Sequence, residues 1–364
     1  MTSYTTRSSY PYPDPSDQVA DYPTTASSFA GYLDHLPNRN AIINPVMDIW
    51  QRGTSFSNPA TGSYTADRWR IDYDGAGGTR TVARNTISLG TNLPSGIQGK
   101  YFMEVTLTNA GTATTQSISQ RVERVNTFAG ETITLSAWVR NDGAGTGVNT
   151  LTARAIQNFG TGGSPSTAVS TTLGTASVTG SWVRLHVHAT LPSISGKTIG
   201  SNGDDYLEIK FDLGNQTGRF WLYGVQLEQN TTQTALERRP VQQELALCQR
   251  YYQRFTATTA YARFAVGQSY SGSGHFWLLH FPTSMRIAPS SIDTSGLTAS
   301  NFAITTNSGG TQALNTLPAL AATANSPHSA YLEGTTSGGG TTGAANMLIA
   351  NNLATAFLGF SSEL

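Results

Sequence analysis

Residues 131–140 read ETITLSAWVR, and apolar side chains occupy every second position of this stretch, at Ile133, Leu135, Ala137 and Val139. Successive side chains of a β-strand point to opposite faces, so the pattern predicts a strand with one buried and one solvated face. The same alternation recurs on both sides of this stretch, in KYFMEVTLT (100–108), SWVRLHVHA (181–189) and YLEIKFDL (206–213). Amphipathic strands joined by Gly- and Ser-rich turns predict an all-β sandwich of two antiparallel sheets.

The composition agrees with an all-β fold and excludes several classes of function. Only 12% of the 364 residues are charged, and 37 are glycine, which suits short strands joined by many turns. The 22 basic and 22 acidic residues cancel, which argues against binding to nucleic acid. A single cysteine, Cys248, excludes an intrachain disulfide framework. No apolar run approaches the roughly 20 residues of a membrane span, so we expect no membrane insertion.

The first 37 residues contain several tyrosines and prolines but no sustained apolar period. Such a segment cannot bury a core of its own, so we expect an extended N-terminal arm over residues 1–37. One interpretation is a mobile tail. The other is an anchoring segment that docks Tyr10, Tyr12 and Tyr22 on a partner protein.

A helix is predicted after the sandwich, which we place at residues 38–238. Pro240 occupies a first helical position and is followed by VQQELALCQRYYQRF without further Pro or Gly, so we expect a helix over residues 239–256. Its apolar positions have the 4, 3, 4, 3 spacing of a coiled-coil seam, at Val241, Leu245, Cys248, Tyr252 and Phe255. This stripe either packs on a neighbouring domain or lies along a trimer axis. Strand-like segments return afterwards and predict a second, smaller β-domain over residues 257–364.

Several phrases on both sides of the predicted sandwich resemble one known family. They read NPVMDIWQRG (44–53), ADRW (66–69), GVQLE (224–228), ERRP (237–240) and ELALCQRYY (244–252). They are similar to the segments that open and close a modular β-sandwich of phage tail and virion-surface proteins. The resemblance implies an antiparallel jelly roll similar to carbohydrate-binding modules.

The same resemblance implies a place in the virion after assembly in the host cytoplasm. We expect a homotrimeric tail-fibre or spike component that binds host surface polysaccharide without cleaving it. The alternative is a capsid or neck decoration protein with a purely structural role. A polysaccharide depolymerase is a weaker alternative because no parallel-strand repeat is visible.

Saccharide binding needs an aromatic ring that stacks on a sugar and polar groups that bond its hydroxyls. Trp138 and Trp182 fall opposite the apolar residues of their strands, so each lies either on an open face or against a neighbouring strand. Arg184, His186 and Gln157 are the candidate polar neighbours. His186 and His188 share one strand face, but no third metal ligand lies near them in sequence, so we expect no metal there.

The remaining polar candidates are carboxylates and structural residues. Asp204, Asp205, Glu208 and Asp212 form either a solvated turn and strand edge, a structural calcium site, or a glycosidase pair. We expect the first, and therefore neither a cofactor nor catalysis. Within the family phrases, we expect Asp67, Arg52 and Glu228 to be structural anchors, and Trp50, Trp69 and Trp221 to pack in a core.

Overall fold

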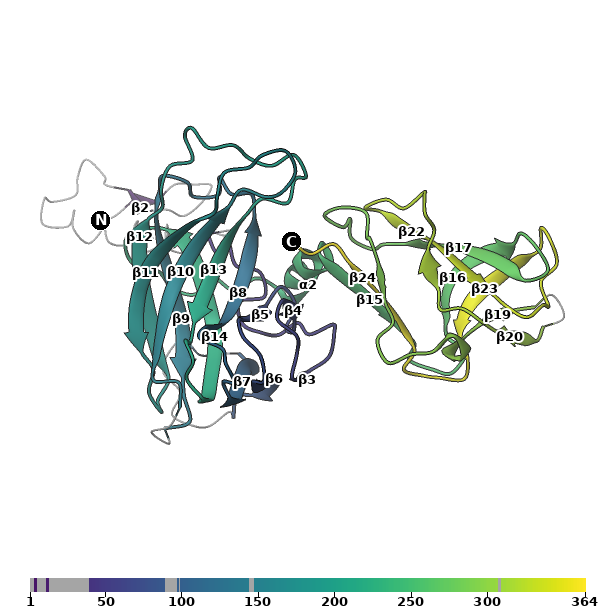
Figure 1. Ribbon diagram of the computed structural model, residues 1–364, viewed down its shortest axis with the longest axis horizontal. Coiled ribbons are helices and arrows are strands. Elements are labelled where there is room, and N and C mark those ends of the chain that lie inside the picture. The colour runs from purple at the N-terminus through teal and green to yellow at the C-terminus, as the bar shows by residue number, and fades with distance from the viewer. Residues whose placement is uncertain are drawn as a thin grey trace, which may run out of the picture. The chain divides into compact units, whose positions relative to one another are not determined.

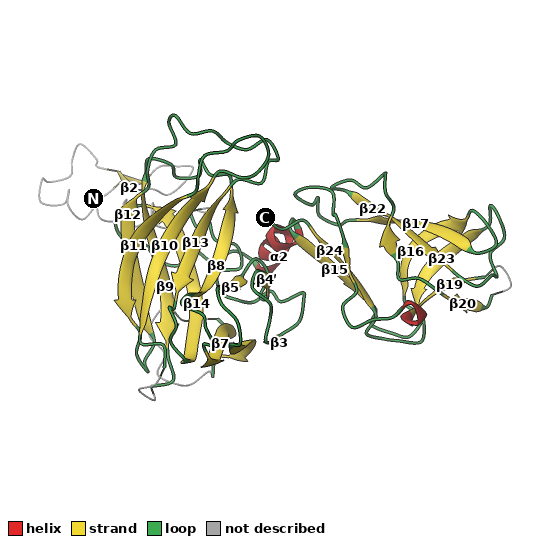
Figure 2. Cartoon of the chain, viewed as in Figure 1, coloured by secondary structure: helices red, strands yellow, loops and turns green. Residues whose placement is uncertain are grey.

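The computed structural model describes residues 39–88, 97, 99–143, 147–306 and 309–364, together with the backbone of two short strands, β1 (Ser3–Tyr4) and β2 (Pro11–Tyr12). β-strands dominate, and among the described residues the helices are α2 (Val241–Gln249) and the single 3-10 turn Ala299–Asn301 (Figure 2). None of the described helices is long and apolar enough to cross a membrane. The predicted all-β class is confirmed.

The chain divides into two compact units, and their sequence boundaries differ from the predicted domains. The first unit comprises residues 1–47, 57–61 and 71–239, and the second comprises residues 48–56, 62–70 and 240–364. Trp50 and Trp69, which the sequence placed at the opening of the sandwich, therefore belong to the second unit. Short strands β3 (Ser55–Ser57) and β4 (Ser63–Tyr64) lie in this interleaved region of the sequence.

The first unit is a jelly-roll β-sandwich of antiparallel sheets (Figure 1). We call the two sheets by their central strands. Within the first unit, the β13 sheet has the strand order β11-β10-β13-β8-β5, with β11 Val169–Ser177, β10 Thr150–Asn158, β13 Tyr206–Asp212, β8 Gln116–Glu123 and β5 Arg70–Tyr73. The β14 sheet has the strand order β12-β9-β14-β7-β6, with β12 Val183–Thr190, β9 Thr132–Arg140, β14 Gly218–Gln229, β7 Tyr101–Asn109 and β6 Thr79–Thr86.

The alternating residues fill the interior of the sandwich as predicted. Ile133, Leu135, Ala137 and Val139 of β9 are fully buried, and so are the alternate positions of β13, namely Leu207, Ile209, Phe211 and Leu213. β12, the last strand of its sheet, departs from this pattern: Leu185 is buried, but Val183 is 40% exposed and Val187 and Ala189 are half-buried. With the apolar residues turned inward, the intervening side chains of each strand face outward.

The predicted helix of residues 239–256 is too long. Pro240 precedes α2 as expected, and its carbonyl accepts a hydrogen bond from the Glu244 amide (3.0 Å), but the helix ends at Gln249. The following aromatic residues form strand β15 (Tyr252–Thr256), which pairs with β24 (Phe357–Ser361). Val241, at the start of the supposed seam, is 58% exposed, and Tyr252 and Phe255 lie on the strand. No coiled-coil stripe therefore forms here, because the strand preference of the aromatic residues prevails.

The second unit has its own core and two sheets. A three-stranded sheet has the order β15-β24-β18, with β18 at Ile292–Asp293. A seven-stranded sheet has the order β20-β19-β23-β16-β17-β22-β21, with β20 Thr311–Ala313, β19 Phe302–Thr305, β23 Ala345–Ala350, β16 Arg263–Ser269, β17 Gly274–His280, β22 Ser329–Thr335 and β21 Ala319–Leu320. Trp277, Phe302, Leu332 and Phe360 are fully buried between them.

Candidate functional site

A cluster of polar side chains lies on the outer face of the β13 sheet. Leu207 and Ile209 point into the sandwich, so the intervening Tyr206 and Glu208 point outward. Glu208 lies opposite Arg121 of β8, and Asp72 comes from β5, the next strand. We call the set formed by Asp72, Ser119, Arg121, Tyr206 and Glu208 the polar face.

Two carboxylates of the polar face meet at one hydroxyl group. The Ser119 Oγ lies 3.0 Å from Asp72 Oδ2 and 2.8 Å from Glu208 Oε1. A serine hydroxyl has one hydrogen, so it donates to only one of these oxygens at a time. Carboxylate oxygens are strong hydrogen-bond acceptors. The centre of the face is therefore rich in hydrogen-bond acceptors.

A basic and an aromatic group stand beside these carboxylates. The guanidinium carbon of Arg121 lies 4.2 Å from the centre of the Tyr206 ring, and its Nε lies 3.8 Å from Glu208 Oε1. Glu208 is only 8% exposed although it is on an outer face, whereas Tyr206 is half-buried. A ring, a guanidinium and carboxylates on one rigid sheet supply both stacking and hydrogen bonding to a polyhydroxylated ligand.

The sequence cluster of four carboxylates does not stay together. Asp204 accepts hydrogen bonds from the amide (2.7 Å) and hydroxyl (2.6 Å) of Thr161, and Asp205 accepts one from the Val125 amide (2.8 Å). Both carboxylates therefore tie loops, as expected for a turn. In the described part of the chain, no three His, Cys, Asp or Glu side chains are arranged to hold a metal ion.

The predicted ligand residues on β9 and β12 lie on the outer face of the other sheet. Trp138 is buried (8% exposed), Trp182 is half-buried and His186 is exposed. Arg184 donates from Nη2 to Ser136 Oγ (3.1 Å) and to the Thr234 carbonyl (2.6 Å). Arg184 is thus engaged in local structure, and Trp138 lies beneath other side chains.

The position of Gln157 contradicts its predicted role as a polar neighbour of Trp138 and Trp182. It lies on β10 in the opposite sheet, is 1% exposed, and donates to the Pro192 carbonyl (3.0 Å). It is therefore not a neighbour of Trp138 or Trp182 on their outer face. The sequence could not reveal this, because alternation gives the side of a strand but not the sheet to which the strand belongs.

Glu228 is held by a closed set of hydrogen bonds in the first unit. Its carboxylate accepts from the Thr234 amide (2.9 Å), the Thr234 hydroxyl (2.6 Å) and the Gln226 side chain (2.9 Å). These bonds fasten residues 230–235 to the end of β14. This arrangement agrees with the expectation that Glu228 is a structural anchor.

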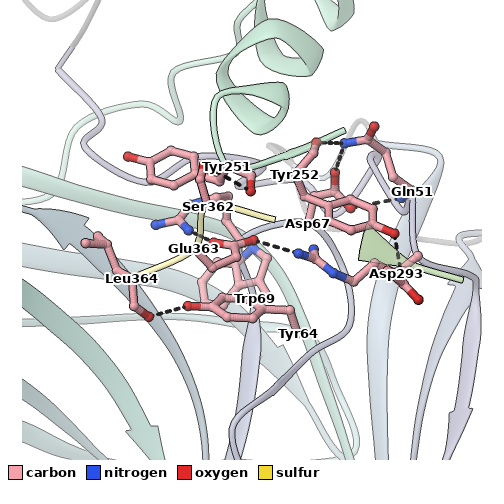
Figure 3. A network of polar contacts seen from close by, with 12 residues as sticks. Gln51, Tyr64, Asp67, Trp69, Tyr251, Tyr252, Asp293, Ser362, Glu363 and Leu364 are labelled. Atoms are coloured by element: carbon pink, nitrogen blue, oxygen red, sulfur yellow. Dashed lines mark hydrogen bonds and ion pairs between the residues drawn. The ribbon is translucent and has the colours of Figure 1, made fainter. Parts of the chain in front are cut away.

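Asp67 and Arg52 lie in a buried polar network of the second unit. Figure 3 shows Asp67 beside Gln51 and Tyr252 in this network. Asp67 accepts hydrogen bonds from the Gln51 amide (2.9 Å) and the Gln51 side chain, which also donates to the Tyr252 carbonyl (2.7 Å). Arg52 pairs with Glu363 (3.1 Å) and lies over the Tyr252 ring. Burial raises the pKa of Asp67, and the nearby Arg52 opposes that rise.

Replacing Asp67 by Ala is expected to destabilise the second unit by about 1–3 kcal/mol, because the Gln51 amide loses its buried acceptor. Differential scanning calorimetry of the full chain measures this effect. An unchanged melting curve would contradict the structural role, and ligand binding by the first unit should remain unchanged.

The proposed arm residues Tyr10, Tyr12 and Tyr22 lie outside the residues whose side chains are described.

The comparisons with known proteins reach only distant similarity. Neither a known protein family nor a curated protein matches the sequence. Among solved structures, the chain is similar to the enzymatically active domain of tailspike protein 4 of bacteriophage CBA120 (14% identity, TM-score 0.32, 54% of this chain and 22% of that one). It is also similar to TmCBM61 in complex with β-1,4-galactotriose (15% identity, TM-score 0.29, 53% of this chain and 100% of that one). A third similar structure is the CBM22-1-GH10 part of Clostridium thermocellum xylanase 10B in complex with xylohexaose (13% identity, TM-score 0.32, 53% of this chain and 29% of that one). Similarities of this size carry no argument about ligand or activity.

Proposed function

We propose that the polar face binds a neutral saccharide without cleaving it. The observation that carries this proposal is the convergence of Asp72 and Glu208 on the Ser119 hydroxyl. Sugar hydroxyls both donate and accept, so their chemistry matches a surface that combines carboxylates with a guanidinium. Tyr206 adds a half-buried ring that can contact the apolar face of a pyranose.

In the setting implied by the sequence phrases, this binding serves attachment of a phage virion to a host surface polysaccharide. We propose a homotrimeric tail-fibre or spike component, held in the virion through the N-terminal arm. A shallow sheet face gives weak single sites, and several copies on one particle raise the total avidity steeply. The rival is a structural decoration protein, which would bind no saccharide.

Glu208→Gln is expected to weaken saccharide binding about 10- to 100-fold, because it removes a charged acceptor while preserving shape. The full chain is first tested on an array of bacterial surface polysaccharides, and the affinity for a bound glycan is then measured by titration calorimetry. Glu131→Gln is the matched control, because this carboxylate bonds Gln229 at an exposed position away from the polar face.

Equal affinities of the wild type and Glu208→Gln would contradict the proposed site. Absence of any glycan binding by the wild type would contradict the proposed function and favour the decoration protein. The same paired carboxylates favour one second candidate, glycoside hydrolysis, since most glycosidases use two carboxylates. New reducing ends in the bound polysaccharide would establish that candidate, and their absence supports binding without cleavage.

A further inference from the structure

The outer face of the β14 sheet carries a separate group of aromatic and charged side chains. Trp221 lies between Glu104 of β7 and Arg140 of β9 in the strand register. The neighbouring Val105, Val139 and Leu222 are buried inside the sandwich, so the three side chains of this row face outward.

Two further rings complete the group. Trp182 precedes β12, and Phe102 comes from β7. The ring centres of Phe102 and Trp182 are 5.6 Å apart, those of Phe102 and Trp221 are 5.5 Å apart, and those of Trp182 and Trp221 are 6.3 Å apart. Trp138 and Tyr223 of the same cluster are buried, whereas Trp182 and Trp221 remain half-buried. The indoles therefore keep part of their surface in contact with solvent.

The charged members flank the indole of Trp221 from two sides. Glu104 Oε2 accepts hydrogen bonds from Trp221 Nε1 (2.6 Å) and Asn85 Nδ2 (2.9 Å), which fixes the orientation of the ring. The guanidinium carbon of Arg140 lies 4.5 Å from the ring centre. Its buried Nε has no hydrogen-bond partner in the described part of the chain. A buried donor without a partner is costly. Arg140 as a whole is only half-buried, so its guanidinium can supply donors to an acceptor on a bound ligand.

We propose that Trp182, Trp221, Phe102, Glu104 and Arg140, here called the aromatic surface, form a second saccharide-binding site. Indole rings bind the C–H face of a sugar, and the guanidinium of Arg140 donates to a sugar oxygen. The surface combines acidic and basic groups, since Arg219 Nε also lies 4.0 Å from Glu104 Oε1. Such a mixture suits a polar ligand that both donates and accepts hydrogen bonds. An apolar protein segment would leave the Arg140 donor unmet. The aromatic surface does not depend on the polar face, because the two lie on different sheets.

The test uses the full chain on the same array of bacterial surface polysaccharides, with Trp182→Ala and Tyr206→Ala compared with the wild type. We expect Trp182→Ala to lose at least 10-fold in affinity for glycans that Tyr206→Ala still binds. Trp182→Phe, which keeps an aromatic ring, should recover part of that affinity. Arg140→Gln is an independent test if Trp182→Ala folds poorly, and it should lower the affinity for the same glycans.

The possible outcomes separate the two sites. If Tyr206→Ala abolishes all glycan binding while Trp182→Ala and Arg140→Gln match the wild type, the second site is refuted and the polar face stands. If the Trp182 and Arg140 variants lose binding while Tyr206→Ala and Glu208→Gln do not, the aromatic surface stands and the polar face is refuted. Absence of binding by the wild type refutes both.

Discussion

Replacing Arg68 by Met is expected to lower the free energy of unfolding of the second unit by about 3 kcal/mol. The Arg68 side chain is 1% exposed, pairs with Glu363, and lies with its guanidinium carbon 3.4 Å from the centre of the Tyr251 ring. Methionine has a similar length but no charge. It therefore removes one partner from a buried ion pair and leaves the carboxylate of Glu363 with only its pairing to Arg52.

The size of the effect follows from burial. The Glu363 side chain is only 7% exposed, so water cannot replace the lost guanidinium. The pair joins residues 62–70 to the end of the chain, and Tyr64 adds a bond from its hydroxyl to the Leu364 carbonyl (3.0 Å; Figure 3). Loss of Arg68 should therefore free both segments together.

Hydrogen exchange during denaturant titration, read at the amides of β15 and β24, measures this effect in the full chain. Arg263→Met is the matched control, because Arg263 is exposed in the same unit. A loss below 1 kcal/mol, equal to that of the control, would contradict a stabilising role for the pair.

The strands could be predicted from sequence because their signal is local. Alternation at Ile133, Leu135 and Ile209 directly reports a buried face, and all three are fully buried. The unit boundaries could not be predicted in the same way. Residues 48–56 and 62–70 precede most of the sandwich in sequence but belong to the same unit as residues 240–364. No local sequence pattern encodes contacts between segments so far apart in the chain. The helix was overextended for a related reason, because Tyr252 and Phe255 fit a heptad by spacing but pair with β24.

The polar face illustrates what sequence reasoning misses at a binding site. Asp72, Ser119 and Glu208 are separated by 47 and 89 residues, and they meet only through the order of β5, β8 and β13. In sequence, Glu208 is close to Asp204 and Asp205, and this proximity predicts a shared turn and strand edge instead of a contact with Asp72. Trp182 was identified as a ligand candidate from its side of the strand alone. Its actual neighbours, Phe102 and Trp221, again depend on the strand order.

We expect His275 to make the stability of the second unit sensitive to pH. It is fully buried on β17, and burial lowers its pKa below 6.5. Its Nε2 lies 2.9 Å from the Thr336 hydroxyl, which itself donates to the Gly338 carbonyl (2.7 Å). The hydroxyl proton is thus used, so Nε2 must carry the hydrogen of the imidazole.

The other ring nitrogen is then an acceptor. Trp277 Nε1 donates to Asn346 Oδ1 (2.6 Å), which orients the amide so that Nδ2 donates to Ser269 Oγ (3.0 Å). Ser269 in turn donates to His275 Nδ1 (3.0 Å). Protonation of Nδ1 would turn the Ser269 hydrogen away from its acceptor, and the network would lose a bond in a buried place.

The folded state therefore favours neutral His275, while the unfolded chain binds a proton near pH 6.5. The contribution to stability is complete above about pH 6.5 and is lost as the pH falls toward and through the lowered pKa, with a slope of at most about 1.4 kcal/mol per pH unit. We expect the free energy of unfolding of the second unit to fall between pH 7.5 and 5.5, measured by hydrogen exchange at β17 and β22. His275→Gln should be less stable at pH 7.5 but should lack this pH dependence, whereas His280→Gln, at an exposed position of β17, should retain it. Equal pH profiles for the wild type and His275→Gln would show that another group governs the acid response.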